Sequence, residues 1–235
     1  MVLDLSNFIY LEKHNFIFAY VPKVACTNWK CIFRYLNGAV DYLDSGLAHD
    51  RNSSGLTYLN MVPNALELLN NSDIKKYTFV RNPYSRALSA YRNKVEQFNG
   101  LENSMQSQDF WIRVYNTIKT EMNLVNEVTF KEFLIWLSSS NHSFARNEHW
   151  CTQSDIVHPN SVKFDYIGKF ENIDFDARNI LNMIGCDINF PTQKQVKFPG
   201  TNATSLVDKY YTSEIYELVT KLYNDDFLNF NYKKI

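Results

Sequence analysis

The feature that most constrains the fold is the segment FIFAYVPKVACTNWKCIFRYL at residues 16–36. Residues 16–21 are apolar at every position, which is typical of a parallel strand covered on both faces, although a run of this length also suits a buried helix. The Pro22 that follows favours a strand that ends there. From Thr27 onward apolar residues recur at helical spacing, and Asn37-Gly38 provides a stop. The segment therefore predicts a strand, a short loop and a helix.

The same order of elements recurs further along the chain. Residues 77–80, YTFV, predict a second strand, and Pro83 suits the first position of the helix that follows it. A third strand is expected over 164–170, with a helix over about 174–184 after it. Strands that alternate with helices predict one α/β domain over residues 1–235, with a mainly parallel central sheet flanked by helices.

Other segments predict helices with less bearing on function. Thr129 and Glu132 form the pattern of a capping box, so a helix is expected to begin near residue 130. Further helices are expected over three ranges: 62–70, 108–119 and 213–227. The local pattern alone assigns no role to residues 99–128.

The charge balance restricts the kinds of partner. Lys and Arg number 24 against 25 Asp and Glu, so the chain lacks the overall positive field that attracts nucleic acid or an anionic membrane. Charged residues interrupt the apolar N-terminal segment, so neither a signal peptide nor a membrane span is expected there. The four cysteines form no Cys-x-x-Cys pair, which favours reduced thiols in a cytoplasmic protein.

Two cationic residues follow the first two predicted strands. In an open parallel sheet, anionic ligands bind where strands lead into helix N-termini. We expect Lys23 to contact one phosphate, and Arg81 to share a second phosphate with Ser89, which lies about two helical turns further on. The loop expected to wrap the first phosphate consists of Val24, Ala25, Cys26, Thr27 and Asn28. Taken singly, each cation also fits a solvated charge or a helix cap.

A nucleoside triphosphate site of the P-loop kind is the competing interpretation of this loop. The pattern G-x-x-x-x-G-K-[ST] is absent, and no glycine precedes Gly38. A kinase is therefore a weak alternative.

The two loops resemble those of a known enzyme family. VPKVACTNWK (21–30) resembles the 5′-phosphosulfate loop of the carbohydrate sulfotransferases, and FVRNPYSRALSAYRNK (79–94) resembles their 3′-phosphate motif, with Arg81 and Ser89 at its two key positions. The similarity is greatest to the Golgi branch that contains the chondroitin and dermatan 4-O-sulfotransferases. It extends to three later segments: NEHW (147–150), FDYIGKFENIDFDA (164–177) and LYNDDFLNFNY (222–232).

The resemblance implies a P-loop-like sulfotransferase fold and a reaction. The enzyme would move a sulfuryl group from 3′-phosphoadenosine-5′-phosphosulfate (PAPS) to an acceptor hydroxyl and release adenosine 3′,5′-bisphosphate, without a metal. Lys23 would then stabilise the charge that grows on the leaving phosphate. A catalytically inactive nucleotide-binding protein of the same fold is the alternative, although such a protein would not require Lys23.

The acceptor hydroxyl requires a base, and histidine suits this role near neutral pH. His49 lies between the two phosphate loops and resembles the base histidine of the related uronyl 2-O-sulfotransferases, so we place it first. His149 belongs to the NEHW motif and is a second candidate, with a structural role as the more favoured interpretation. Glu148 is a third candidate.

The sequence departs from the Golgi relatives in ways that bear on location and acceptor. Val157-His158-Pro159-Asn160 replaces their Cys-x-x-Cys pair, which fits a reducing cytoplasm. Residues 99–128 have little to match in these relatives, and acceptor specificity is expected to reside there. The acceptor is expected to be a carbohydrate or a small-molecule alcohol, and not a highly sulfated polyanion, because the sequence has no long basic stripe. The oligomeric state stays open.

Overall fold

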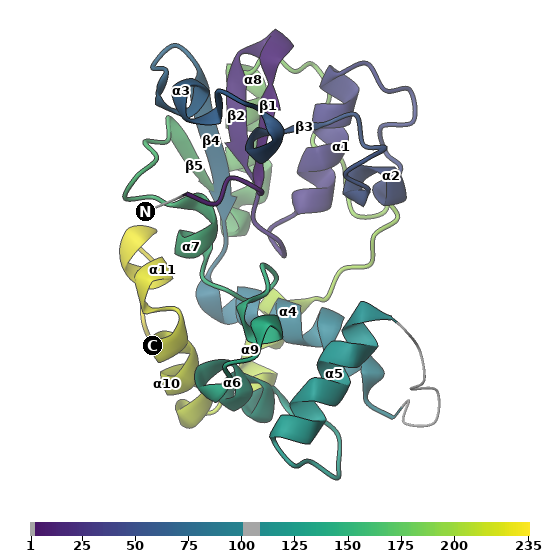
Figure 1. Ribbon diagram of the computed structural model, residues 1–235, viewed down its shortest axis with the longest axis vertical. Coiled ribbons are helices and arrows are strands. Elements are labelled where there is room, and N and C mark those ends of the chain that lie inside the picture. The colour runs from purple at the N-terminus through teal and green to yellow at the C-terminus, as the bar shows by residue number, and fades with distance from the viewer. Residues whose placement is uncertain (1–2, 101–108) are drawn as a thin grey trace. The chain divides into compact units, whose positions relative to one another are not determined.

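The computed structural model describes residues 3–100 and 109–235 (Figure 1). Residues 101–108, within the region 99–128, lie outside the described residues. The chain packs into two compact units. The first consists of Met1–Arg81 and Gln153–Gly200, and the second of Asn82–Thr152 and Thr201–Ile235. The single domain over 1–235 stays a prediction.

The first unit is built on a five-stranded sheet in the order β3-β1-β2-β4-β5. Its strands are β1 (Phe8–Leu11), β2 (Phe16–Ala19), β3 (Thr57–Tyr58), β4 (Lys75–Val80) and β5 (Tyr166–Lys169). The three predicted strands, β2, β4 and β5, run parallel to one another. The antiparallel strands β1 and β3 were not expected from the sequence. The α/β class with a parallel central sheet is therefore confirmed, and the sheet as a whole is mixed.

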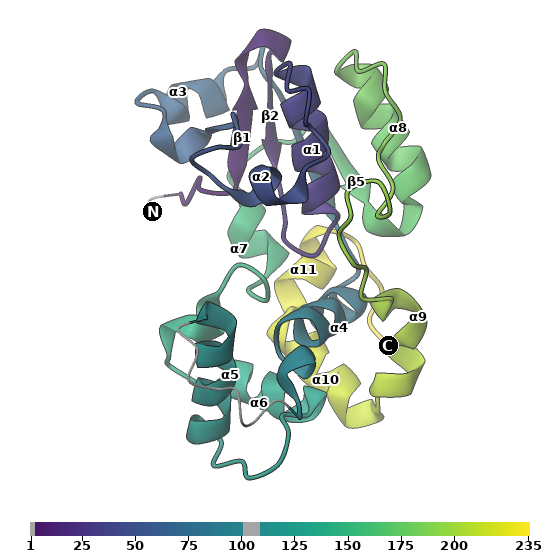
Figure 2. The ribbon, with the colours of Figure 1, turned by 90° about the vertical axis from the view of Figure 1, so that its right-hand side faces the viewer.

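Helices flank this sheet, with α1 and α8 on one side and α3 on the other (Figure 2). The α-helices of the unit are α1 (Cys26–Leu36), α2 (Ser45–His49), α3 (Ala65–Asn70), α7 (Gln153–Val157) and α8 (Ile173–Met183). Short 3₁₀ turns are η1 (Glu12–His14), η2 (Leu59–Met61) and η6 (Phe170–Asn172). The predicted stop of α1 is confirmed, because Gly38 has φ +86° and donates its N–H to Tyr35 O at 2.8 Å.

Aromatic side chains fill the space between the sheet and α1. Trp29 is fully buried, and its ring lies 4.8 Å from that of Phe18 in β2 and 5.2 Å from that of Phe79 in β4. On the neighbouring strand, a Cβ at Gly168 would lie 2.1 Å from the Phe79 ring, so β5 approaches only because this residue is glycine. This packing fixes the ends of β2 and β4, after which the two predicted phosphate loops begin.

The second unit is helical. Its α-helices are α4 (Pro83–Lys94), α5 (Phe110–Glu121), α6 (Phe130–Ser139), α9 (Ala203–Tyr210), α10 (Ser213–Leu222) and α11 (Asn224–Asn229), with 3₁₀ turns η3 (Glu96–Phe98) and η5 (Ser143–Arg146). Pro83 at the first turn of α4 and the capping box of Thr129 and Glu132 at α6 are both confirmed. In the parts of the chain described, no helix is long and apolar enough to cross a membrane.

The predicted C-terminal helix over 213–227 is two helices. Tyr223 interrupts it with φ −113° and ψ 27°, outside helical geometry. The Tyr223 hydroxyl donates to Trp150 O at 2.7 Å in the buried core, and a straight helix through this position is not formed. A tertiary contact therefore overrides the local helical pattern.

Candidate active site

The loop after β2 has an unusual backbone. Lys23 has φ 71° and Ala25 has φ 51° with ψ 31°, so two residues that are not glycine occupy the left-handed region. Between them Val24 is buried and donates its N–H to Val21 O at 3.3 Å. Each left-handed residue costs about 1–2 kcal/mol, and such strain is concentrated at functional sites. The sequence pattern predicted the loop and not its conformation.

The start of α1 carries backbone donors that no side chain caps. The first helical bond runs from Trp29 N–H to Ala25 O at 3.2 Å, and no side chain makes a capping hydrogen bond there. By contrast, the Asn82 side chain accepts from Tyr84 N–H at the start of α4. The N–H groups of residues 26–28 precede the first helical bond, and together with the helix dipole they favour an anion at this place. The loop therefore fits a phosphate group.

Thr27 and His49 lie together at this helix start. The Thr27 Oγ1 and His49 Nε2 atoms are 2.8 Å apart, which is a hydrogen bond whose direction depends on the tautomer of the histidine. His49 is the last residue of α2 and is exposed, and its ring centroid lies 5.9 Å from that of Phe198. The structure thus brings the first base candidate to the predicted phosphate loop.

Arg81 lies against the same loop. It is buried, at 4% exposure, and its Nη1 atom donates to the backbone carbonyl of Lys23 at 3.0 Å. The guanidinium carbon lies 4.3 Å from the centroid of the Phe170 ring. The two cationic residues predicted from neighbouring strand ends are therefore brought together at one edge of the sheet.

Gln153 is a residue that the sequence did not single out. It is fully buried, its Oε1 atom accepts from the Arg81 N–H, and its Nε2 atom donates to the Arg81 carbonyl, both at 2.8 Å. The Gln153 amide thus pairs with the N–H and the carbonyl of Arg81 in the way that the backbone of a neighbouring β-strand would. The contact joins residues 72 positions apart, so no local pattern announces it. Phe170 was within reach of prediction, because it follows the third strand and strand ends meet at one edge.

Asn28 and Cys26 complete the predicted loop. Asn28 is buried, and its Nδ2 atom donates to Pro191 O at 2.7 Å, which ties α1 to a distant loop of the same unit. Cys26 is half-buried. The four cysteines, all in the described part of the chain, form no disulfide, and burial raises the pKa of the Cys31 thiol to about 11.

In the second unit, Ser89 is buried in α4. Its Oγ atom lies 2.9 Å from Thr201 Oγ1, and the Arg92 guanidinium donates to the Thr201 carbonyl. Ser89 therefore has a defined hydroxyl partner within its own unit, and its assignment to a phosphate stays a prediction.

In the NEHW loop, also in the second unit, backbone carbonyls accept hydrogen bonds from a buried arginine. Arg86 is buried, with Nη1 donating to Cys151 O at 2.6 Å and Nη2 to Glu148 O at 3.0 Å. His149 Nδ1 lies 2.8 Å from Asn147 Oδ1. These contacts give His149 a fixed place in the loop, which favours the structural interpretation of this residue. Within the described residues no group of three or more His, Cys, Asp or Glu is arranged to hold a metal ion.

Comparison with known proteins identifies the family of the chain. The profile described as "Sulfotransferase family" matches residues 6–233. The chain belongs to the sulfotransferase family. This sulfotransferase-family enzyme is 31% identical to rat (Rattus norvegicus) carbohydrate sulfotransferase 11 over 242 residues, which cover 97% of the chain and 68% of the relative.

Other relatives of this sulfotransferase-family enzyme are longer still. Zebrafish (Danio rerio) carbohydrate sulfotransferase 14 is 31% identical over 204 residues, which cover 85% of the chain and 54% of the relative. Human carbohydrate sulfotransferase 9 is 30% identical over 243 residues, covering 95% and 53% respectively. The chain thus spans about half of these two relatives. No solved structure gives a significant match.

Proposed function

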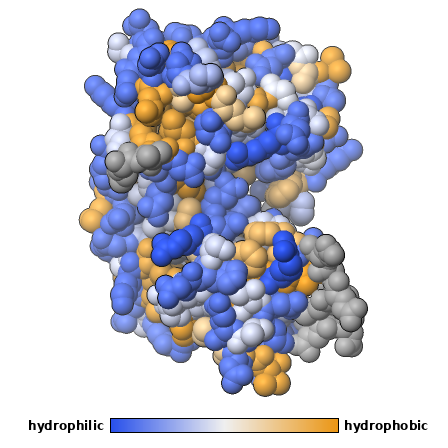
Figure 3. All heavy atoms as spheres, in the orientation of Figure 1, coloured by the Kyte–Doolittle hydropathy of each residue, from blue (hydrophilic) through white to orange (hydrophobic). Residues whose placement is uncertain are grey.

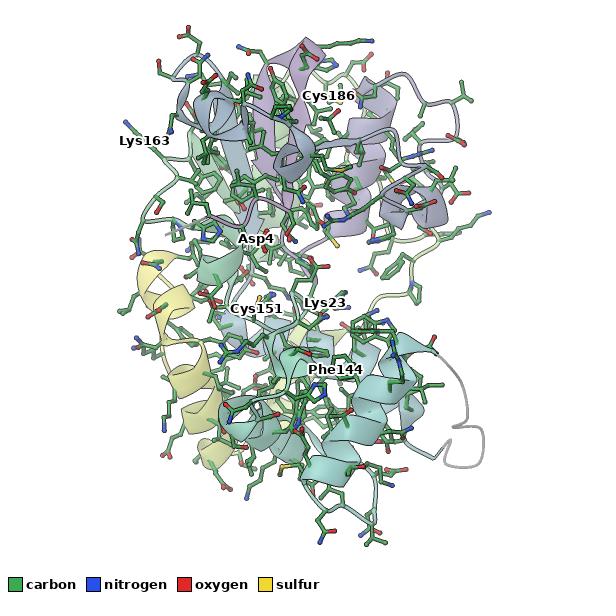
Figure 4. The ribbon with its side chains drawn as sticks, in the orientation of Figure 1. Asp4, Lys23, Phe144, Cys151, Lys163 and Cys186 are labelled. Atoms are coloured by element: carbon green, nitrogen blue, oxygen red, sulfur yellow. The ribbon has the colours of Figure 1, made fainter. Side chains whose placement is uncertain are left out.

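We propose that the chain transfers a sulfuryl group from PAPS to a hydroxyl of a carbohydrate acceptor. The observation that carries the proposal is the 3.0 Å hydrogen bond from Arg81 to the carbonyl of Lys23, which places the two cationic residues of the family's nucleotide motifs side by side (Figure 4 labels Lys23). Family membership and the names of the relatives support the reaction and the carbohydrate acceptor.

Lys23 and the start of α1 are assigned to the leaving side of the reaction. Bound PAPS would supply a sulfuryl group on the oxygen of its 5′-phosphate. The Lys23 ammonium and the N–H groups of residues 26–28 stabilise negative charge at that phosphate, and they need no rearrangement as the charge grows. The left-handed conformations of Lys23 and Ala25 support this assignment, because they fold the loop around the position that an anion would take.

Arg81 and Ser89 are assigned to the 3′-phosphate. A guanidinium has five N–H donors and matches phosphate geometry, so one side chain is able both to brace the Lys23 loop and to bind the ligand. Support for Ser89 comes from the family motif, in which it follows Arg81 by eight residues.

His49 is assigned as the general base for the acceptor hydroxyl. Its 2.8 Å contact with Thr27 supports this role, because the imidazole lies at the helix start where the phosphosulfate would bind. In this scheme the imidazole takes the hydroxyl proton while the acceptor oxygen forms its bond to sulfur and the bond from sulfur to the 5′-phosphate oxygen breaks. His149 and Glu148 stay the alternative bases.

Two further proposals concern the acceptor class and the location of the protein. A small-molecule alcohol stays the alternative acceptor class, because the sequence leaves it open, and the relatives' names specify a carbohydrate without saying which one. A cytoplasmic location is proposed because Val157-His158-Pro159-Asn160 stands where the Golgi relatives have a Cys-x-x-Cys pair.

A catalytically inactive nucleotide-binding protein is the alternative function. It shares the donor site and differs only in turnover, so a binding assay alone does not separate the two. Purified protein should be incubated with PAPS and a panel of sugars and small alcohols, with release of adenosine 3′,5′-bisphosphate followed by chromatography. Acceptor-dependent release supports the proposal. A rise in melting temperature with the bisphosphate but no release with any acceptor supports the alternative.

A further inference from the structure

The segment of residues 41–54 carries the proposed base and has only a small apolar anchor. It contains α2, which ends at His49. In its middle Ala48 is fully buried and packs in a small cluster with Cys31 and Val196. Hydrophilic residues, shown in blue, predominate on the visible surface of the first unit where α2 lies (Figure 3). Because the apolar anchor is small, polar contacts decide where the ends of this segment lie.

One buried arginine of α1 holds both ends of this segment. Arg34 is 3% exposed. At the first end, its Nη2 atom donates to the Asp41 carboxylate at 2.5 Å and to the Asp41 carbonyl at 3.3 Å. At the other end, its Nη1 atom donates to the Ser54 carbonyl at 2.9 Å. Hydrogen bonds from a charged donor are stronger than those between neutral groups, so a single side chain ties both ends to α1.

The same helix also contacts the His49 imidazole. Thr27 and Arg34 both belong to α1, so the residue that contacts the imidazole and the residue that ties the ends of the segment lie on one rigid element. The helix α2 lies beside α1 in both ribbon views (Figure 1 and Figure 2). The place of the His49 ring at the phosphate loop therefore depends on two attachments, which are the contact with Thr27 and the ends held by Arg34.

A general base works only within a narrow range of distances. It has to lie about 2.6–3.2 Å from the oxygen whose proton it takes, and a displacement of about 1 Å costs up to roughly 10² in rate. When the ends of a loop are released, its conformational freedom rises and its middle moves over a wider range. Arg34 lies about 10 Å along the helix axis from Thr27, yet by fixing both ends of the loop that carries His49 it is able to act on the rate.

On the basis of the function proposed above, in which His49 is the base, we propose that Arg34 is a positioning residue of the proposed reaction. It acts through His49, by holding residues 41–54 so that the imidazole stays at the phosphate loop. The hydrogen bonds that hold Arg81 beside that loop come from other segments of the chain. Donor affinity is therefore independent of Arg34, whereas kcat depends on it.

A double-mutant cycle on the full chain tests this role through kcat. Arg34→Gln should lower kcat by roughly tenfold, and by no more than His49→Ala does, because the imidazole loses its fixed place. In the His49→Ala background the same change should have no further effect, since a residue that acts only through His49 then has nothing to position. Affinity for adenosine 3′,5′-bisphosphate, measured by calorimetry, should not change. Arg178→Gln, at an exposed position in α8 of the same unit, is the matched control and should alter neither quantity.

Nuclear magnetic resonance follows the imidazole without any turnover. In the wild type the ring protons of His49 and Phe198 should show cross-relaxation, because the two ring centroids lie 5.9 Å apart. Arg34→Gln should weaken this signal, and Arg178→Gln should leave it unchanged. If Arg34→Gln does not fold, Asp41→Ala takes its place in both experiments. The Asp41 side chain is 56% exposed, so its removal releases the first end of the segment without opening the core.

Four results would overturn the role of Arg34. These are an unchanged kcat in Arg34→Gln, an equal loss of kcat with and without His49, a parallel loss of bisphosphate affinity, or a cross-relaxation signal that neither Arg34→Gln nor Asp41→Ala weakens. Failure of the proposed function gives a different result, because the wild type itself then releases no bisphosphate with any acceptor. In that case the role of Arg34 in the reaction is rejected with the function, and the resonance experiment alone shows whether Arg34 holds the His49 imidazole.

Discussion

The Lys23 loop of the first unit and the first turn of α5 in the second unit are two different kinds of surface. In the Lys23 loop the polar groups are backbone N–H groups and cations, held by hydrogen bonds of 2.8–3.0 Å at buried residues such as Arg81 and Gln153. In the first turn of α5 the rings of Phe110 and Trp111 are partly exposed and are held by edge-on packing. Fixed dipoles are suited to stabilising charge in a reaction, and the α5 turn offers ring surface instead. The comparison therefore favours the first surface over the second as the place of the proposed donor chemistry.

The largest effect is expected for Lys23→Ala, which tests whether chemistry belongs to the first surface. Removal of the ammonium at the leaving phosphate should lower kcat by on the order of 10²–10³. The melting temperature should change little, because Lys23 lies in a loop and is only half-buried. Lys163→Ala, at an exposed position of the same unit, is the control. Wild-type turnover in Lys23→Ala would remove the proposed mechanism.

His49→Ala sharpens the assignment of the base. Loss of a general base is expected to lower kcat by on the order of 10² and to abolish the acidic limb of the pH–rate profile. His149→Ala should have a much smaller effect on kcat, since the His149 ring is held in place by Asn147 Oδ1 at 2.8 Å and by edge-on packing against Trp111 at 4.8 Å. If His149→Ala loses the acidic limb and His49→Ala keeps it, the base is His149 in the second unit. The assignment of the base to His49 beside the Lys23 loop is then wrong.

Gln153→Ala tests whether the first surface depends on a rigid support. The change leaves the buried N–H and carbonyl of Arg81 without their amide partner, so the free energy of unfolding should fall by about 2 kcal/mol. Affinity for adenosine 3′,5′-bisphosphate should fall as well, and calorimetry measures it. Gln97→Ala, at an exposed position, should alter neither quantity. An unchanged affinity would show that Arg81 needs no such support.

The smallest effect is expected at Glu121 in the second unit. Hydrogen bonds from the Ser140 hydroxyl and the Trp136 indole N–H, both 2.6 Å long, lower the pKa of Glu121 below its ordinary value of 4.5. A lowered folded-state pKa contributes stability that is present above the unfolded-state pKa and is lost as the pH falls through the folded value. Urea unfolding should therefore show Glu121→Gln as slightly less stable than the wild type at about pH 7, and this difference should disappear as the pH falls below the folded-state pKa of Glu121. The affinity of Glu121→Gln for adenosine 3′,5′-bisphosphate should not change. A change would mean that Glu121 in the second unit influences the proposed donor site of the first unit.

Local patterns predicted the elements that carry their own signals. Strand β2 is an apolar run that ends before Pro22, β4 ends in the segment YTFV before Arg81, and β5 lies within the predicted segment 164–170. Pro83 and the Thr129 capping box mark helix starts. Strands β1 and β3 were missed because four and two residues carry little pattern, and pairing with a neighbour defines them: β1 pairs with β2, and β3 pairs with β1. Helices α2, α7 and α9 were also missed.

The site residues also divide into those that a sequence pattern predicts and those that it does not. Lys23 and Arg81 were predictable because strand ends in a parallel sheet meet at one edge, and the Arg81 contact with the Lys23 carbonyl agrees with that expectation. Gln153 was not predictable, because its contact depends on where a distant segment packs. The surface at the start of α5 combines Phe110 and Trp111 with Lys94 at the end of α4 and with packing against Phe144, so its residues share no sequence spacing.

The most direct test of the account is whether Arg81 recognises the 3′-phosphate in addition to bracing the Lys23 loop. Calorimetry should compare adenosine 3′,5′-bisphosphate with adenosine 5′-monophosphate on the wild type and on Arg81→Lys, as a cycle in which protein and ligand are each changed once. The account predicts that Arg81→Lys weakens binding of the bisphosphate by roughly tenfold or more and leaves binding of the monophosphate nearly unchanged. Equal losses for both ligands would contradict it, because Arg81 would then act on the loop alone.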